Sequence, residues 1–195
     1  EREEQKYEAI FGDLGEGIYP LDSEIFTHQY KQENIDPRWL HYGVFMSPPN
    51  NSRDSWAYIS SGMSNPWEKE EKDEYSGLGV EFVLETKEKS VWAIEVVRSL
   101  IAYNILLSVG RFGDFPMLDY GHRIPMKLTP SISHIMVVSP SHYPDHIDFM
   151  SGRVDFLHAI GITAKEHSSA ELKEKLVEAN IYPLTIRDRQ NPMKA

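Results

Sequence analysis

The 195-residue chain carries 30 acidic and 20 basic side chains, a formal net charge of -10 at pH 7. Its 41% apolar and 26% charged residues are typical of a globular protein and exclude a disordered chain. The charge disfavours phosphate backbones and anionic lipids, and the lack of cysteine excludes disulfides and zinc-thiolate sites. We therefore expect a cytoplasmic protein with no nucleic-acid partner, no membrane partner and no cofactor.

The first half of the chain predicts a helix followed by strands. Tyr7, Ile10 and Phe11 recur at helical spacing, which predicts an amphipathic helix over residues 2–14. The glycine-rich and polar stretch that follows predicts no firm element before residue 40. Residues 40–46 and 55–60 are aromatic and β-branched, and the prolines and asparagines between them are turn formers, so two neighbouring strands are expected.

Residues 68–74 hold five acids and two lysines, which favours a solvated connection over an acidic binding site. The next segment, residues 79–85, alternates as a half-buried strand does. The alternation puts Glu81 and Glu85 on one face of that strand. A general acid and base would suit such a pair, but a solvated strand face explains both carboxylates more simply.

The second half predicts one buried helix and further strands. Residues 91–109 are apolar with few polar interruptions, so we expect a helix that packs across the sheet, with Ser90 as its N-cap. Residues 110–129 are rich in proline and glycine and predict an irregular excursion. Residues 134–138 and 154–160 predict strands, the second with one polar face that includes His158.

Two capping-box spacings, Thr163 with Glu166 and Ser168 with Glu171, predict a C-terminal helix that runs to about Asn180. Strands interspersed with a few helices predict an α+β fold, an α/β sandwich with a central mixed β-sheet and helices packed on it. The length suits one domain over residues 1–195 with a core at about 40–180.

Motifs for catalysis and metal binding are weak. No phosphate-binding glycine loop and no nucleophile elbow occurs, so the sequence gives no positive sign of an enzyme. The candidate ligands for a divalent metal are His134, His142, Asp145 and His146. Prolines around this segment argue against a helix that would align the imidazoles, so loop histidines are the favoured interpretation and a metal-dependent hydrolase the alternative.

Two segments carry a family resemblance. The run Ser-Trp-Ala-Tyr-Ile-Ser-Ser-Gly-Met-Ser at 55–64 and the run Ser-Gly-Leu-Gly-Val-Glu-Phe-Val-Leu at 76–84 resemble paired signatures of the Suppressor of Fused domain family. The later order agrees: a long helix, a loop with Pro-Met-Leu at 116–118, a strand at 134–138 and Phe-Leu-His-Ala-Ile-Gly-Ile-Thr at 156–163. The resemblance covers about residues 40–180 and is to the stand-alone bacterial type.

The resemblance implies an α/β sandwich that has no catalytic centre and binds another protein. Animal members hold a transcription factor and carry a further C-terminal domain, whereas the stand-alone type implies an immunity protein against a toxin. Tyr58 and Glu81 are the partner-contact residues that the resemblance implies, with Trp56 and Ser64 as secondary positions. The alternative for the first two is a packed aromatic ring and a hydrogen-bonded strand carboxylate.

The leading hypothesis is thus a non-enzymatic binder, an immunity protein whose acidic surface covers a basic toxin domain. The alternatives are the metal-dependent hydrolase and a regulator that sequesters an endogenous protein.

Overall fold

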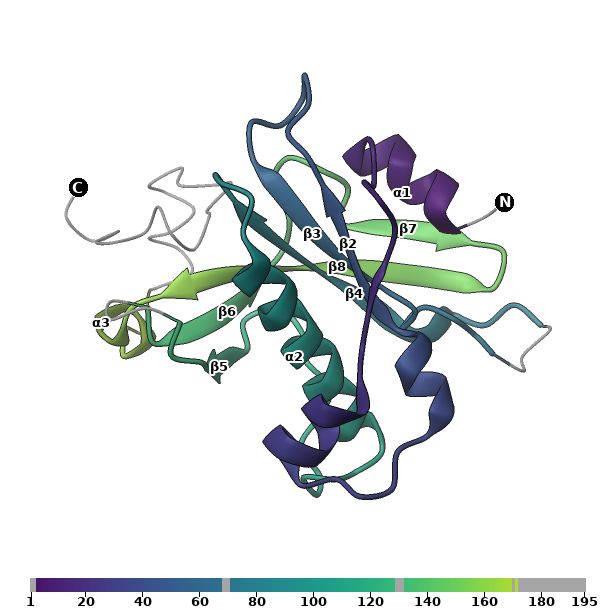
Figure 1. Ribbon diagram of the computed structural model, residues 1–195, viewed down its shortest axis with the longest axis vertical. Coiled ribbons are helices and arrows are strands. Elements are labelled where there is room, and N and C mark those ends of the chain that lie inside the picture. Colours follow the sequence, from purple (N-terminus) through teal and green to yellow (C-terminus); the bar gives the residue numbers. More distant parts are fainter. Residues whose placement is uncertain (1–2, 68–70, 129–131, 170, 172–195) are drawn as a thin grey trace.

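The fold is built around one mixed sheet with helices on both faces (Figure 1). The computed structural model describes residues 3–67, 71–128, 132–169 and 171. Its helices are α1 (Glu3–Phe11), the π-helix η1 (Ile25–Gln29), the 3-10 helix η2 (Pro37–His41), α2 (Val91–Ser108) and α3 (Ala164–His167). Its strands are β1 (Tyr19–Pro20), β2 (Gly43–Ser47), β3 (Trp56–Ser61), β4 (Tyr75–Thr86), β5 (Arg123–Pro125), β6 (His134–Val138), β7 (His146–Phe149) and β8 (Gly152–Ile162).

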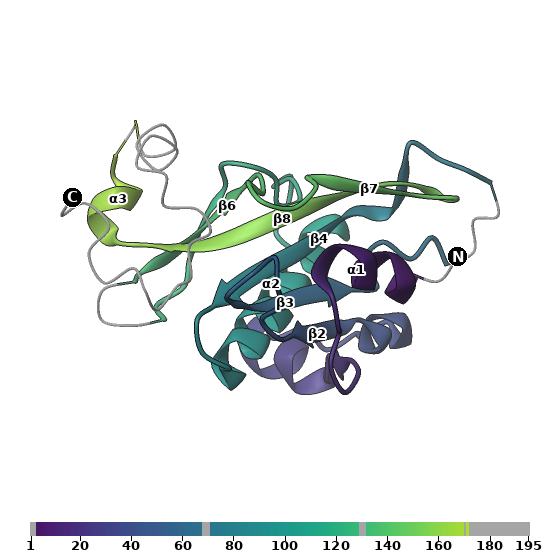
Figure 2. The same cartoon turned by 90° about the horizontal axis from the view of Figure 1, so that it is seen from above.

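The predicted fold class is confirmed. The strand order is β1-β2-β3-β4-β8-β6-β5, and β7 pairs with the start of β8. Only β4 and β8 run parallel among the described pairs, so the sheet is mixed as expected. The turn between β7 and β8 lies at one end of the molecule and α3 at the other (Figure 2).

Helix α2 fills the larger core on one face of the sheet. Its apolar residues pack with alternate residues of β2, β3 and β4, among them Val44, Tyr58 and Phe82. By length and composition alone α2 could cross a membrane, but most of it is buried in the fold. Ser90 occupies the predicted N-cap position, although its hydroxyl donates to the carbonyl of Glu88 instead of accepting from the helix.

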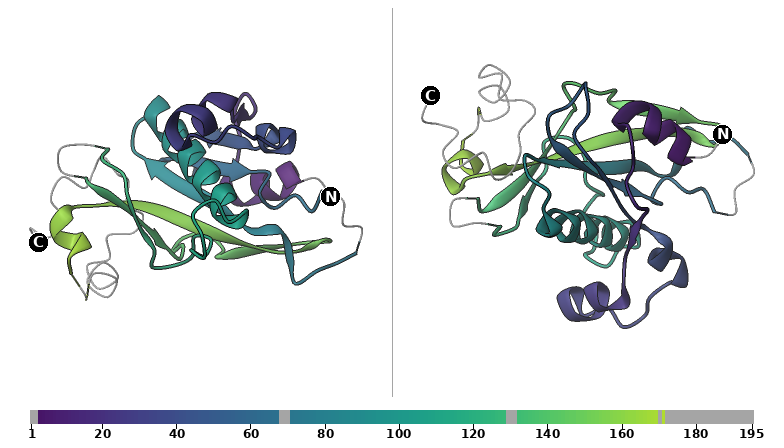
Figure 3. Two further views of the ribbon diagram at one scale, coloured as in Figure 1. Left: turned by 90° about the horizontal axis from the view of Figure 1, so that it is seen from below. Right: turned by 45° about the horizontal axis from the view of Figure 1, so that its top comes forward.

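Helix α1 covers the opposite face (Figure 3). Tyr7 and Phe11 pack there against Phe156, with ring centroids 5.9 Å and 5.4 Å from it. Burial of an aromatic side chain of this kind contributes about 2 kcal/mol. The Phe11 carbonyl, at the helix end, accepts from the side chains of Ser47, Asn50 and Arg53. These three donors anchor the C-terminal end of α1 to the turn between β2 and β3.

The cover by α1 corrects the prediction of a solvated strand face. Phe82, Val83 and Leu84 are buried on both sides of β4, and Glu81 and Glu85 are also fully buried. His158 on β8, predicted on a polar face, is buried as well. Alternation along one strand shows which residues share a face, but the face becomes internal because a distant segment packs over it.

Other predictions are confirmed, are corrected or lie outside the described residues. The strand predicted at 134–138 and the capping box of Thr163 and Glu166 are both present. The C-terminal helix predicted to run to about Asn180 ends instead at His167, where Ser168 is the C-cap of α3 and not the start of a second capping box. Most of the predicted remainder lies outside the described ranges. Strand β7 and the π-helix η1 have no counterpart among the predicted elements.

Candidate functional site

The first notable group of polar side chains surrounds Glu81 under the N-terminal end of α1. Glu81 Oε1 accepts from the backbone N–H and the hydroxyl of Ser64, both at 2.8 Å, and Oε2 accepts from the hydroxyl of Ser60. Glu3 Oε1 of α1 lies 3.0 Å from Ser61 Oγ and 3.1 Å from Ser64 Oγ. We call this group the Glu81 centre: it holds two carboxylates joined through serine hydroxyls.

The Glu81 centre has a surplus of negative charge. Burial, and after it the charge of Glu3, raises the pKa of Glu81 to about 8. Three hydrogen bonds from Ser60 and Ser64 oppose that rise but do not cancel it. The Tyr7 hydroxyl faces the same group, and burial together with both carboxylates raises its pKa well above the ordinary value. The centre therefore favours the protonated forms of Glu81 and Tyr7.

A second group, the Glu85 centre, lies further along the same face of β4. Glu85 Oε1 lies 2.9 Å from His142 Nε2 and 3.8 Å from His158 Nε2, and its other oxygen accepts from the Ser55 hydroxyl. Burial alone would raise the pKa of Glu85, but His142, His158 and Ser55 together lower it. Burial lowers the pKa of His158 to about 4 against the opposing effect of Glu85. A charged carboxylate held by imidazoles is the arrangement this centre stabilises.

Three of the four predicted partner-contact residues are internal. The Tyr58 hydroxyl accepts from Ser90 N at 2.6 Å and its ring lies in the larger core. Glu81 and Ser64 bond to each other in the Glu81 centre. Trp56 is partly buried, with Lys89 Nζ 5.5 Å from its ring centroid. Of the four positions, Trp56 alone presents an accessible ring.

The candidate metal ligands do not converge on one site, which corrects the expectation that they could gather around a single metal ion. His134 stacks on His167 at the α3 end, with ring centroids 3.8 Å apart. His142 bonds to Glu85, while His146 pairs with Asp145 at 2.6 Å. Within the described residues no group of three or more His, Asp or Glu side chains could hold a metal ion. The four side chains thus lie in three places: His134 beside His167, His142 beside Glu85, and Asp145 paired with His146.

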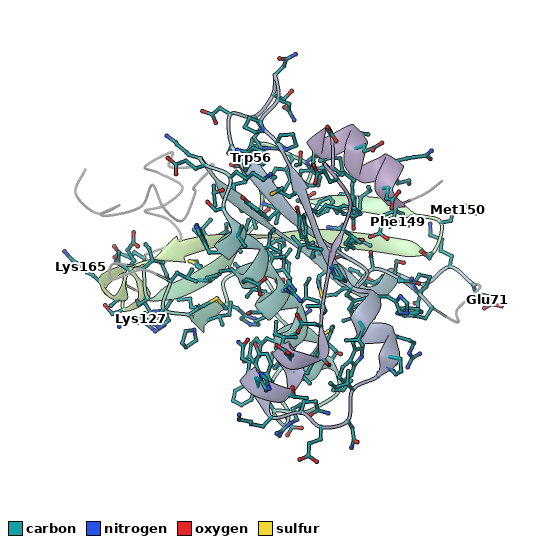
Figure 4. The ribbon with its side chains drawn as sticks, in the orientation of Figure 1. Trp56, Glu71, Lys127, Phe149, Met150 and Lys165 are labelled. Carbon is teal, nitrogen blue, oxygen red and sulfur yellow. The ribbon has the colours of Figure 1, made fainter. Side chains whose placement is uncertain are left out.

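The most accessible candidate surface lies where β4 begins and β7 turns into β8. Tyr75 is 44% and Met150 87% exposed there. Glu74 and Ser151 join the two segments, since the Glu74 carbonyl accepts from Arg153 N and the Ser151 carbonyl from Asp73 N. Figure 4 shows Glu71, Phe149 and Met150 together at this end of the molecule.

We call this surface the hairpin end. It combines apolar side chains with the exposed acids Glu71, Asp73, Glu74 and Asp148. The acidic segment is predicted to be a solvated connection, and its described acids are exposed as expected. Sequence reasoning missed Met150, which lies in the turn between β7 and β8, at the end of β8 where Arg153 pairs with Tyr75.

Comparison with solved structures gives similar folds at low identity. The crystal structure of the Sufu-Fu complex is 19% identical, with a TM-score of 0.56 over 82% of this chain and 80% of that one. Drosophila Suppressor of Fused is 17% identical, with a TM-score of 0.52, and the alignment covers 82% of this chain but 44% of the fly chain. A putative SUFU homolog from Neisseria gonorrhoeae is 21% identical, with a TM-score of 0.55 over 84% and 90% of the two chains.

The sequence itself supplies the assignment. A search of curated proteins gave no match. The sequence profile described as Suppressor of fused protein (SUFU) matches residues 38–184, which includes β2 to α3 and leaves α1 outside the match. This match spans most of the chain and agrees with the segments that carried the resemblance. The chain therefore belongs to the Suppressor of fused protein (SUFU) family.

Proposed function

We propose that this chain acts by binding a basic partner protein without catalysing a reaction, and that it serves as an immunity protein that neutralises a toxin. The family match over residues 38–184 carries this proposal, because SUFU domains are protein-interaction domains. One of the similar structures is a complex of Sufu with Fu. Binding another protein is thus the general activity, while the toxin is our specific proposal for the partner.

The charge of the chain supports a basic partner. A net charge of -10 attracts a basic surface and accelerates the encounter, and this effect weakens as salt screens it. The hairpin end offers such a partner Tyr75 and Met150 as apolar contacts beside Glu71, Glu74 and Asp148. Apolar contact area edged by charge is the usual composition of a protein interface.

A cytoplasmic location suits this role, since a chain with no cysteine has no disulfide to lose in a reducing compartment. Fractionation of the native host with an antibody against the chain tests it. Recovery with the membrane or secreted fraction would contradict the location.

The function is tested by affinity capture from host lysate at low salt, with elution at high salt and identification by mass spectrometry. We expect one abundant basic protein, and a toxin domain among the eluted proteins supports immunity. A housekeeping protein instead would replace immunity by the regulator alternative, in which the chain sequesters an endogenous factor.

The surface is tested with charge reversals. Glu74→Lys with Asp148→Lys changes the hairpin end, and Glu33→Lys with Asp114→Lys makes the same charge change at exposed positions elsewhere. We expect the first pair to slow association by about tenfold more than the second, because steering depends on local charge. Equal effects of the two pairs would rule out the hairpin end as the docking surface.

A further inference from the structure

Helix α1 is held on the sheet at two ends by different chemistry. At its C-terminal end the Phe11 carbonyl accepts from Ser47, Asn50 and Arg53, and none of these contacts needs a change of protonation. At its N-terminal end Glu3 contacts the hydroxyl of Ser64, which also bonds to Glu81. The N-terminal contact joins two acids, so it is the one that depends on protons.

The hydrogens available at the N-terminal contact can be counted. The Ser64 hydroxyl has one hydrogen, yet its oxygen lies 2.8 Å from Glu81 Oε1 and 3.1 Å from Glu3 Oε1. One contact uses that hydrogen, and the other can be a hydrogen bond only if a carboxyl group supplies a second one. Two ionised carboxylates would instead face each other across a single hydroxyl, with Glu81 fully buried and Glu3 partly buried.

Among the described residues, no cation forms an ion pair with the two acids, Glu3 and Glu81. In the described part of the chain, the other titratable groups that interact with the pair are Tyr7 on α1 and Tyr42 beside β2, while β3 and β8 present serines and Phe156. The amine of Lys6 on α1 is directed to the carbonyl of Asp148 and the ring of Phe149 instead.

We propose that α1 is a proton-linked latch, which stays docked while the Glu81 carboxyl group next to Glu3 holds a proton and loosens from its N-terminal end when that proton is lost. The raised pKa of Glu81, about 8, agrees with the count of hydrogens. Because docking raises this pKa above the ordinary 4.5, docking takes up a proton. The latch is therefore tight below pH 4.5 and weakens as pH rises through about 8.

The latch also controls access to a covered face. Glu81 and Ser64 are internal while α1 is docked, and so are Phe45, Ile59 and Phe156. Any partner that touches Glu81 or Ser64, as the family resemblance implies, has to displace the N-terminal end of α1 first. The latch involves this chain alone, so a test of the latch does not depend on whether the proposed partner exists.

Hydrogen exchange of the whole chain, followed by mass spectrometry from about pH 6 to pH 9 and corrected for intrinsic rates, tests the latch. We expect the protection of a peptide that covers α1 to fall by up to about tenfold per pH unit between pH 6 and pH 8, since docking binds one more proton in this range. Peptides from β4 and β8 serve as the internal control for the fold. Protection of α1 that does not change with pH in the wild type would overturn the proposal.

Substitutions at Glu81 and Glu3 test whether these two residues cause the pH dependence of α1 protection. The Glu81→Gln side chain keeps the shape of glutamate and supplies hydrogens without charge, so the protection of α1 in this variant should be independent of pH. If Glu81→Gln folds poorly, Glu3→Gln replaces it, and the same result is expected. Glu4→Gln is the matched control, because it removes an exposed acid from the same first turn of α1. It should retain the wild-type pH dependence. A Glu81→Gln or Glu3→Gln variant with the wild-type slope would overturn the latch.

Discussion

Glu81 and Glu85 lie on the same face of the same strand and are both fully buried, yet their pKa values are shifted in opposite directions. Around Glu81 the neighbours are serines and a second acid, so burial prevails and the pKa rises. Around Glu85 two histidines and a serine outweigh burial, and the pKa falls. The comparison teaches that burial makes a charge costly, while the neighbours decide whether the group keeps it.

The largest expected effect is acid destabilisation through the Glu85 centre. Burial lowers the pKa of His158 from 6.5 to about 4, so in this window the unfolded chain binds a proton that the folded chain excludes. The free energy of unfolding should fall by about 3 kcal/mol as pH drops through this window. Urea denaturation across the window measures it. The His158→Gln variant should lose less stability over the same range, and an equally steep loss would contradict the assignment.

Removing the charge of Glu85 should have the second largest effect on the free energy of unfolding. Glu85→Gln replaces charge-assisted bonds to His142 and Ser55 with neutral ones and should lower the free energy of unfolding at pH 7 by about 2 to 3 kcal/mol. Glu74→Gln, at an exposed position, should change it by less than about 0.5 kcal/mol. Chemical denaturation compares the two variants, and equal stabilities would mean that Glu85 carries no structural charge.

The Glu81→Gln substitution should become more favourable for stability as pH rises. The raised pKa makes the wild type lose about 2 kcal/mol as pH rises from about 6 to 8. Glu81→Gln lacks this loss, so its stability relative to the wild type should increase over that range. Denaturation midpoints at both pH values measure the change. A constant difference between variant and wild type would show that Glu81 is ionised throughout.

A smaller effect should come from the hydroxyl that donates to Glu85. Ser55→Ala removes one of the donors that hold the carboxylate and should cost about 1 kcal/mol at pH 7. Ser52→Ala, an exposed serine of the same turn, is the control. Thermal unfolding of both variants should separate them, whereas indistinguishable midpoints would remove Ser55 from the Glu85 centre.

Much of the fold was predictable from local patterns. The strands at 134–138 and 55–60, the long apolar helix and the capping box at Thr163 follow from apolar periodicity and from residues that prefer particular backbone shapes. These signals are local, so they do not depend on how distant segments of the chain pack. The signatures around residues 55–64 and 76–84 likewise sufficed for the family.

The candidate site was much less predictable. Alternation put Glu81 and Glu85 on one face but suggested solvent there, because the segments that cover this face, α1 and the turn before β7, are distant in sequence. Three of the four candidate metal ligands lie within five residues of one another, yet only Asp145 and His146 lie together, because His142 bonds to Glu85 and His134 stacks on His167. Met150 joins the hairpin end only through the pairing of β7 with β8.

The sequence by itself therefore determined most of the elements, the mixed fold and the family, since these depend on spacing between neighbours along the chain. Tertiary structure alone decided which carboxylates are buried, which bases lie beside them and which face α1 closes. The physical reason is that a pKa depends on the groups within a few ångströms, and long-range packing chooses those groups. Two glutamates four residues apart on one strand thus have pKa values shifted in opposite directions, upward for Glu81 and downward for Glu85.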